Sequence, residues 1–217
     1  MKASLVFAFS VTIALSANAS QLSGIPTIVD GDTLDLQGTR IRLHGIDAPE
    51  AGQTCRKPGK GTWKCGDAAI DRLAELSKGG ITCSVSGDDV YGRSLAICHG
   101  PDGADINRML VKDGFAWAFR KYSADYIAVE EHAKSKKVGI WQAETETPWD
   151  FRAAKWAVAQ QTSPDGCPIK GNISKGGRIY HTPWSKWYTK TSINEKAGER
   201  WFCTEAEAIE AGWRAPD

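Results

Sequence analysis

The sequence predicts an α+β protein in which a small five-stranded barrel with about three helices precedes a disulfide-bridged C-terminal module. Three observations lead to this prediction. Strand-like alternation extends from Ile25 to about Cys98, and helical periodicity follows it. Six cysteines fall into pairs that are local in the sequence. The composition changes after Trp141, where a polar stretch separates the main domain from the C-terminal segment.

The first residues predict export. Lys2 precedes an apolar run from Ala3 to Leu15, and the small residues at 17–19 are typical of a cleavage site. The run is shorter than the roughly 20 residues that span a bilayer. We therefore expect a signal peptide at 1–19, no membrane span, and a periplasmic or secreted protein.

The charge of the chain is balanced, with 27 basic and 26 acidic residues. A balanced chain lacks the overall positive field that attracts nucleic acid non-specifically. Any affinity for nucleic acid must therefore come from local groups of basic residues.

The order of the predicted elements indicates the type of barrel. Two alternating runs meet at Gly38, and a helix over 66–78 interrupts the strands. A hairpin follows, then a helix over 104–112 and another that begins at Ser123, whose hydroxyl is a good helix cap. Strands with an inserted helix, followed by helices, match the OB-fold, a five-stranded and partly open barrel that binds nucleic acid.

An even number of cysteines in an exported chain favours disulfides over free thiols. Cys83 and Cys98 are equally distant from a turn at Val90–Tyr91, so a hairpin would place them opposite each other, within disulfide reach. The local pairing also suggests Cys55 with Cys65 and Cys167 with Cys203. The last bridge would close a loop long enough to stabilise the small final segment by roughly 4 kcal/mol.

These features divide the chain into the signal peptide, an OB-type domain at 20–147, a linker with a short helix at 148–166 and a C-terminal module at 167–217. The linker helix, WDFRAAKWAVAQQ, is expected to pack back on the barrel. We expect a monomer.

Three short blocks carry the candidate chemistry, namely VDGDT at 29–33, RLHGIDAPE at 42–50 and DVYGR at 89–93. Hydrolysis of a phosphodiester needs a hard cation, a base for water, and cationic groups for the charge that grows on the phosphate oxygens. Asp32 and Asp47 are carboxylates suited to a cation such as calcium. Glu50, held by the stiff Pro49, is positioned to act on water.

Arg42 and Arg93 complete this set. A guanidinium donates two parallel hydrogen bonds to a phosphate, a geometry that lysine does not provide. Taken singly, each block also has a structural interpretation, since Asp-Gly is a common turn and Tyr-Gly-Arg fits the tip of a hairpin.

In order, spacing and identity, the three blocks resemble the staphylococcal nuclease (thermonuclease) family over about Ile25 to Trp141. The resemblance implies a calcium-dependent enzyme that cuts DNA and RNA and leaves 3′-phosphate ends. It implies calcium ligands at Asp32, Asp47 and the Ala48 carbonyl, and catalytic residues at Arg42, Glu50 and Arg93. It also implies substrate contacts at Tyr91 and Asp89.

The sequence departs from the family in two places. Ala48 stands where the family has threonine, which removes a hydroxyl but keeps the carbonyl. A loop after Glu50, bounded by Cys55 and Cys65, carries four basic residues at 56, 57, 60 and 64. This loop can be a crosslinked surface loop or an element that shapes how the substrate strand enters, and we favour a mixture of the two.

The C-terminal segment resembles a small module that trails bacterial nuclease-like proteins. Between Cys167 and Lys190 it carries basic residues and no acidic ones, interleaved with Tyr180, Trp184, Trp187 and Tyr188. This pattern is typical of single-strand binding, although we expect at least half of the four aromatics to form the core of the module. His181 between two cysteines leaves zinc as a less favoured alternative.

The sequence therefore predicts an exported, calcium-dependent phosphodiesterase with little base specificity, since contacts to phosphate carry no sequence information. The alternatives are a non-catalytic OB-fold protein that binds nucleic acid, and an envelope-associated protein whose C-terminal module does the main task.

Overall fold

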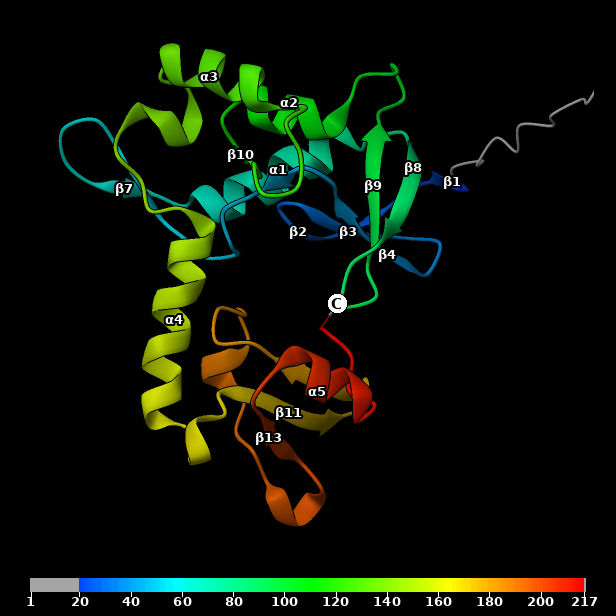
Figure 1. The fold of residues 1–217 in the computed structure, drawn as a ribbon, viewed down its shortest axis with the longest axis vertical. Coiled ribbons are helices and arrows are strands. Elements are labelled where there is room, and N and C mark those ends of the chain that lie inside the picture. The colour runs from blue at the N-terminus through cyan, green and yellow to red at the C-terminus, as the bar shows by residue number, and fades with distance from the viewer. Residues whose placement is uncertain (1–19, 217) are drawn as a thin grey trace, which may run out of the picture.

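Short strands with alternating burial curl the first part of the chain into a sheet (Figure 1). In β3 (Thr33–Leu36) and β4 (Thr39–Leu43) the side chains of Leu34, Leu36, Ile41 and Leu43 are fully buried. The computed structural model describes residues 20–216, so the predicted signal peptide at 1–19 lies outside the described residues. In spatial order the strands of this sheet are β1 (Ser20–Gly24), β8 (Ile81–Asp88), β9 (Ser94–His99), β4 (Thr39–Leu43), β3 (Thr33–Leu36) and β2 (Thr27–Asp30).

The sheet has one strand more than the five expected. The additional strand is β1, which pairs in antiparallel fashion with β8 along its whole length. Its sequence, SQLSG, contains one large apolar residue, Leu22, so alternation could not reveal it. A separate two-stranded pair, β5 (Ile46–Asp47) with β10 (Trp117–Ala118), lies beside the sheet.

Three helices cover the barrel, which confirms the α+β class. They are α1 (Cys65–Leu76), α2 (Ile106–Lys112) and α3 (Ile127–Ser135). The predicted start of the third helix was wrong, because the hydroxyl of Ser123 accepts from the Asp125 N–H in a local turn and the helix begins four residues later. Asp105 caps α2 by accepting from the Arg108 N–H.

The predicted hairpin forms, with Cys83 directly opposite Cys98. We expected the same register to continue to the tip, which would pair Asp88 with Arg93. The register instead shifts between Val85 and Gly87, so that Asp88 pairs with Ser94. A bulge inserts one extra residue into a strand and turns the following side chains. The irregularity therefore decides how the tip of the hairpin faces the rest of the molecule.

All three expected disulfides are present, Cys55–Cys65, Cys83–Cys98 and Cys167–Cys203. Bridges of this kind persist outside the reducing cytosol. A zinc site at His181 would need the thiolates of Cys167 and Cys203 as ligands. These two cysteines form a disulfide with each other, so they do not bind zinc. Over residues 20–216, no helix combines the length and the apolar character that crossing a membrane requires.

The linker helix α4 (Pro148–Thr162) begins at Thr147, whose hydroxyl accepts from the Asp150 N–H. The N-terminal part of the helix packs on the barrel, where Trp149 stacks on Phe119 at 6.0 Å between ring centroids. The rest of α4 runs away from the barrel to the C-terminal module (Figure 1), where Trp156 packs against the core of the module. The helix α4 thus connects the barrel to the C-terminal module as a strut, and it does not lie along the surface of the barrel as expected.

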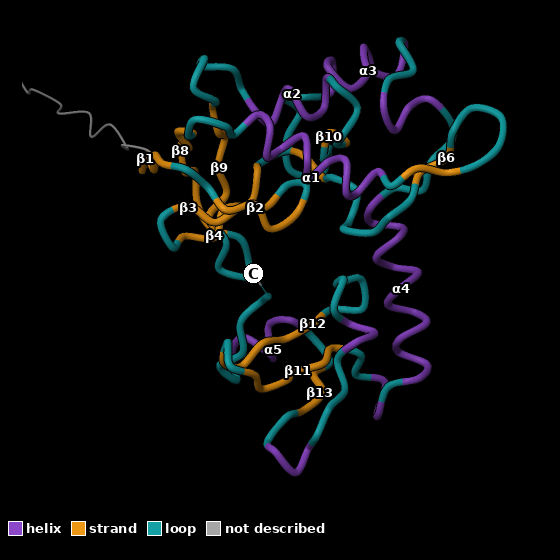
Figure 2. The backbone as a smooth tube through the Cα atoms, turned by 180° about the vertical axis from the view of Figure 1, so that it is seen from behind, coloured by secondary structure: helices purple, strands orange, loops and turns teal. Residues whose placement is uncertain are grey.

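The C-terminal module is a three-stranded antiparallel sheet with one helix, shown from behind in Figure 2. Its elements are β11 (Ile169–Ser174), β12 (Gly177–His181), β13 (Arg200–Phe202) and α5 (Glu205–Glu210). The remaining short elements are β6 (Cys55–Arg56), β7 (Thr62–Trp63) and the 3₁₀ turns Gly139–Gln142, Pro164–Gly166, Tyr188–Lys190 and Glu195–Ala197. After α5 the chain returns to the barrel, where the Pro216 carbonyl accepts from Arg40 at 3.1 Å.

The core of the module contains fewer of its aromatics than expected. Of the four aromatics between residues 180 and 188, Tyr180 is the one that belongs to this core, together with Phe202 and Trp213. Trp184 and Tyr188 are partly exposed and Trp187 is 42% exposed. The expectation that at least half of them would form the core was therefore wrong.

Candidate functional site

The predicted site residues meet at one cavity of about 700 Å³ bounded by the barrel, α4 and the C-terminal module. Seven of the eight line it, namely Asp32, Arg42, Ala48, Glu50, Asp89, Tyr91 and Arg93. The eighth, Asp47, is fully buried beneath the surface of the cavity. The three sequence blocks therefore come together in space, although they lie on different strands and turns.

Asp32 lies in the turn between β2 and β3, and this turn fits closely against residue 48. A side chain at Gly31 would bring its Cβ within 2.8 Å of the Ala48 Cβ. The carboxylate of Asp32 accepts from the Ala48 N–H at 3.1 Å and from Arg42 at 2.8 Å. Burial raises the pKa of Asp32, but Arg42 and the Ala48 N–H outweigh burial, so the pKa lies below its ordinary value.

Arg42, on β4, holds both candidate metal carboxylates. One of its amino groups donates to Asp32 and the other donates to Asp47 at 2.9 Å. Burial alone would lower the pKa of Arg42, but the two carboxylates raise it. The guanidinium therefore stays charged, as a phosphate ligand must.

Glu50 is held by a network that the sequence did not reveal. Its N–H donates to the side-chain carbonyl of the buried Gln53 at 3.0 Å, and its own carbonyl accepts from the Gln53 N–H at 2.8 Å. The first turn of α1 packs directly on this loop, because a Cβ at Gly66 would lie only 1.8 Å from the Glu50 carbonyl oxygen. Backbone and helix together thus fix the direction of the Glu50 side chain.

Three carboxyl groups that line the cavity, Glu50, Asp30 and Glu205, have pKa values raised mainly by burial. Burial raises the pKa of Glu50 well above its ordinary value, and the neighbouring charge of Asp30 raises it further, against the effect of Arg152. Burial and the charge of Asp32 raise the pKa of Asp30 to about 6. Like charges that gather in a cavity disfavour ionisation of one another and mark functional sites more often than structural ones.

Arg152 is the residue that sequence reasoning missed. It lies on α4, and its two amino groups donate to the two carboxylate oxygens of Asp47 at 3.2 and 2.7 Å. It also donates to Glu50. Asp47 and Arg152 are 105 positions apart, so no local pattern in the sequence could have indicated the contact.

The hairpin tip supplies the second predicted arginine. Asp89 accepts from the backbone N–H groups of Tyr91 and Arg93, both at 2.9 Å, and from the Arg93 side chain at 2.6 Å. The Arg93 guanidinium lies 5.4 Å from the centre of the Tyr91 ring. Asp89 therefore positions Arg93 and closes the tip, and the substrate contact that the resemblance implies for it stays a prediction.

The basic loop between Cys55 and Cys65 has no demonstrated part in the site. Its disulfide packs with Trp117 and Ile140 in a small cluster. The four basic residues of the loop are exposed and do not line the cavity described above. The segment is thus an exposed, crosslinked loop, and a part in the entry of the substrate strand stays a prediction.

The donor chemistry of the site fits a hard cation. Asp32 and Asp47 approach the same guanidinium from two elements, and beside them the pKa values of Asp30 and Glu50 are raised by burial and further by neighbouring carboxylates. Oxygen donors of this kind, with a backbone carbonyl and waters, suit calcium. Within residues 20–216, however, no group of three or more His, Cys, Asp or Glu side chains has the arrangement of a metal centre, and Arg152 occupies the oxygens of Asp47.

Comparison with known proteins agrees with this geometry. A family model described as staphylococcal nuclease homologue matches residues 40–143, and one described as ArfC matches residues 147–215. The chain is 35% identical over 132 residues to the succinoglycan biosynthesis protein ExoI of Rhizobium meliloti, covering 59% of this chain and 69% of that protein.

Two further relatives carry nuclease names. One is an uncharacterized endonuclease of Escherichia coli O157:H7, 32% identical over 136 residues, covering 59% of this chain and 82% of that protein. The other is a micrococcal nuclease of Shigella flexneri, 32% identical over 145 residues, covering 58% of this chain and 78% of that protein. The chain therefore belongs to the staphylococcal nuclease family of enzymes.

Proposed function

We propose that this enzyme is an exported, calcium-dependent nuclease that hydrolyses phosphodiester bonds in DNA and RNA with little base specificity. The observation that carries the proposal is the common cavity at which two arginines meet a cluster of carboxyl groups. Arg42 and Arg93 bind the phosphate oxygens and stabilise the charge that grows on them. Contacts to phosphate alone give little discrimination between bases.

Glu50 accepts a proton from the attacking water in this scheme. The water oxygen forms a bond to phosphorus while the bond between phosphorus and the 5′ oxygen breaks, so the 3′ end keeps the phosphate. The 5′ oxygen leaves with the bonding electrons and takes a proton from solvent to become a hydroxyl. A carboxyl group whose pKa is raised, as that of Glu50 is by burial, is a stronger base once it ionises. The packing of Gly66 and Gln53 against the Glu50 backbone supports this role, because a base must be held at a fixed distance from its proton.

Asp32, Asp47 and the Ala48 carbonyl are the residues that would hold calcium. When bound, calcium would supply positive charge next to the scissile phosphate. Because Arg152 contacts Asp47, its guanidinium balances part of the carboxylate charge in this structure. Tyr91, at the exposed hairpin tip, is positioned to contact the nucleotide.

We further propose the division of the chain into 20–147, 148–166 and 167–217, after a signal peptide at 1–19. The strut α4 lies within the second of these, and Cys167–Cys203 closes the third.

The test is incubation of the oxidised protein with plasmid DNA and with RNA, in calcium or in chelator. We expect degradation in calcium alone, loss of activity in Arg42→Ala and severe slowing in Glu50→Gln. Glu131→Gln is the matched control for Glu50→Gln, because the Glu131 side chain is exposed and does not line the cavity. Undiminished cutting in chelator rejects the calcium assignment, and full activity of Arg42→Ala rejects the site.

A further inference from the structure

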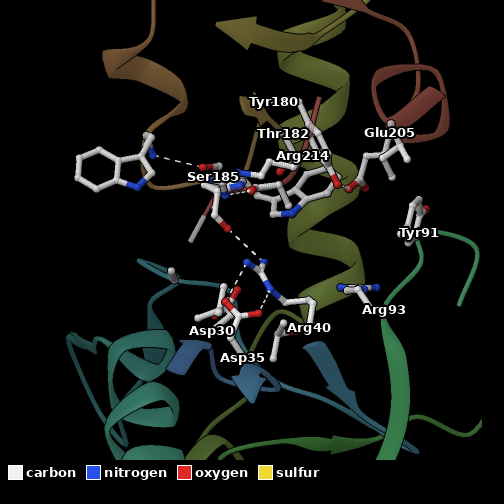
Figure 3. A pocket seen from close by; sticks show the side chains of 18 of the residues that line it. Asp30, Asp35, Arg40, Tyr91, Arg93, Tyr180, Thr182, Ser185, Glu205 and Arg214 are labelled. Atoms are coloured by element: carbon white, nitrogen blue, oxygen red, sulfur yellow. Dashed lines mark hydrogen bonds and ion pairs between the residues drawn. The ribbon is translucent and has the colours of Figure 1, made fainter. Parts of the chain in front are cut away.

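The C-terminal module forms one wall of the candidate site. A second cavity, of about 590 Å³, adjoins the first, and residues from both parts of the chain line each of them. Figure 3 shows Asp30, Arg40 and Arg93 on the barrel side and Tyr180, Thr182 and Glu205 opposite them. The site is therefore a cleft between two walls.

Trp184 is the aromatic residue of the module that lines both cavities, as Tyr91 does from the barrel. It is only partly buried and lies outside the module core, and its ring is tilted against Trp156 of α4 at 6.2 Å between centroids. A large aromatic side chain exposed in a cleft, rather than in a core, is typical of a recognition surface.

The two walls differ in chemical character. The barrel side contributes Arg42 and Arg93, the proposed phosphate ligands. Across the cleft, Glu205 accepts from the Tyr180 hydroxyl at 3.0 Å, and both Glu205 and Trp184 line the cavity. A strand whose phosphate is held by Arg42 and Arg93 on the barrel wall turns its bases away from that wall, toward the module and Trp184.

We propose that Trp184 is a stacking platform for an unpaired nucleobase of the strand whose phosphate lies at Arg42 and Arg93. The ligand class is a single strand of DNA or RNA, because aromatic faces stack on any base and a paired base is not free to turn toward the module. Both cavities have the size of sites for small ligands, roughly 300–1,000 Å³. The cleft therefore holds a few nucleotides of one strand. Stacking here presupposes the proposed nuclease function and adds a substrate contact to it.

The test measures binding in chelator, so that no cutting occurs. Fluorescence anisotropy compares a thymidine decamer with a decamer of the same length that carries abasic residues. We expect Trp184→Ala to weaken binding of the thymidine strand about tenfold, which corresponds to about 1.4 kcal/mol. Trp184→Phe keeps most of the affinity. On the abasic strand, all three proteins bind alike.

Two further variants separate stacking from packing. Trp184→Leu keeps an apolar side chain without a π face, and we expect it to lose affinity as Trp184→Ala does. Trp201→Ala removes an aromatic of the same module that does not line the cleft, and we expect unchanged binding. Thermal unfolding of each variant reports whether the module is folded.

The inference is overturned if Trp184→Ala binds the thymidine strand as tightly as the wild type. It is also overturned if the loss is the same on the abasic strand, because Trp184 would then act by packing on Trp156. Cutting is scored separately in calcium. A protein that stacks bases but cuts nothing overturns the proposed activity and leaves the stacking platform in place.

Discussion

Replacing Arg152 by leucine is expected to destabilise the protein markedly, although the residue lies outside the barrel. The fully buried Asp47 would lose two hydrogen bonds and Glu50 would lose one. Breaking a buried ion pair costs about 3–5 kcal/mol. Arg42 still contacts Asp47 and the Arg152 side chain is 22% exposed, so we expect about 2–3 kcal/mol, or a fall in Tm of about 5–10 °C for a chain of this size.

Thermal unfolding followed by circular dichroism, in chelator at pH 7.5 and with the disulfides intact, measures this effect. Lys155→Leu is the matched control, because Lys155 is an exposed cation on the same helix. At pH 5 the deficit of Arg152→Leu should shrink. The raised pKa of Glu50 means that this group is neutral over more of the acidic range, and a neutral carboxyl needs no cationic partner. A Tm within 1 °C of the control (about 0.3 kcal/mol) would refute the view that Arg152 balances these buried charges.

Three further outcomes are expected. Asp30→Asn should raise the free energy of unfolding in chelator by about 2 kcal/mol at pH 8 but little at pH 4. The pKa of Asp30 is raised from 3.8 to about 6, so the wild type loses stability as pH rises through that interval; equal stability of the two proteins at pH 8 contradicts this. Gly66→Ala should lower kcat at least about tenfold in steady-state kinetics, because the new Cβ displaces the Glu50 backbone, and an unchanged kcat would show that the loop tolerates the shift. Joint replacement of Cys83 and Cys98 by alanine should cost about 3 kcal/mol in urea unfolding, as expected for a loop of this length; a loss below about 1 kcal/mol would show that packing, rather than the bridge, holds the hairpin.

Local sequence patterns were sufficient to predict many of the strands of the barrel. Alternating apolar residues at 34, 36, 41 and 43 mark strands with one buried face, and the spacing of Cys83 and Cys98 around a turn predicts their pairing. The conformation of the hairpin tip could not be predicted, because a bulge at Gly87 shifts the register by one residue without a distinctive sequence signal.

For the candidate site, too, the sequence predicted one part and not the other. The identities of Asp32, Arg42 and Glu50 follow from short motifs, since the residue types that suit phosphate chemistry are few. Their surroundings do not, because the raised pKa values depend on burial and on neighbours that come from other strands.

The sequence by itself thus determined most of the strands, the disulfides and the residue types of the site. Tertiary structure alone decided that Arg152 contacts Asp47 and that Trp184 faces the cleft. Both depend on the direction of α4, which is fixed where Trp149 packs on the barrel and Trp156 packs on the module. Packing between distant surfaces depends on the complementarity of shapes in three dimensions, and the spacing of residues along the chain does not record it.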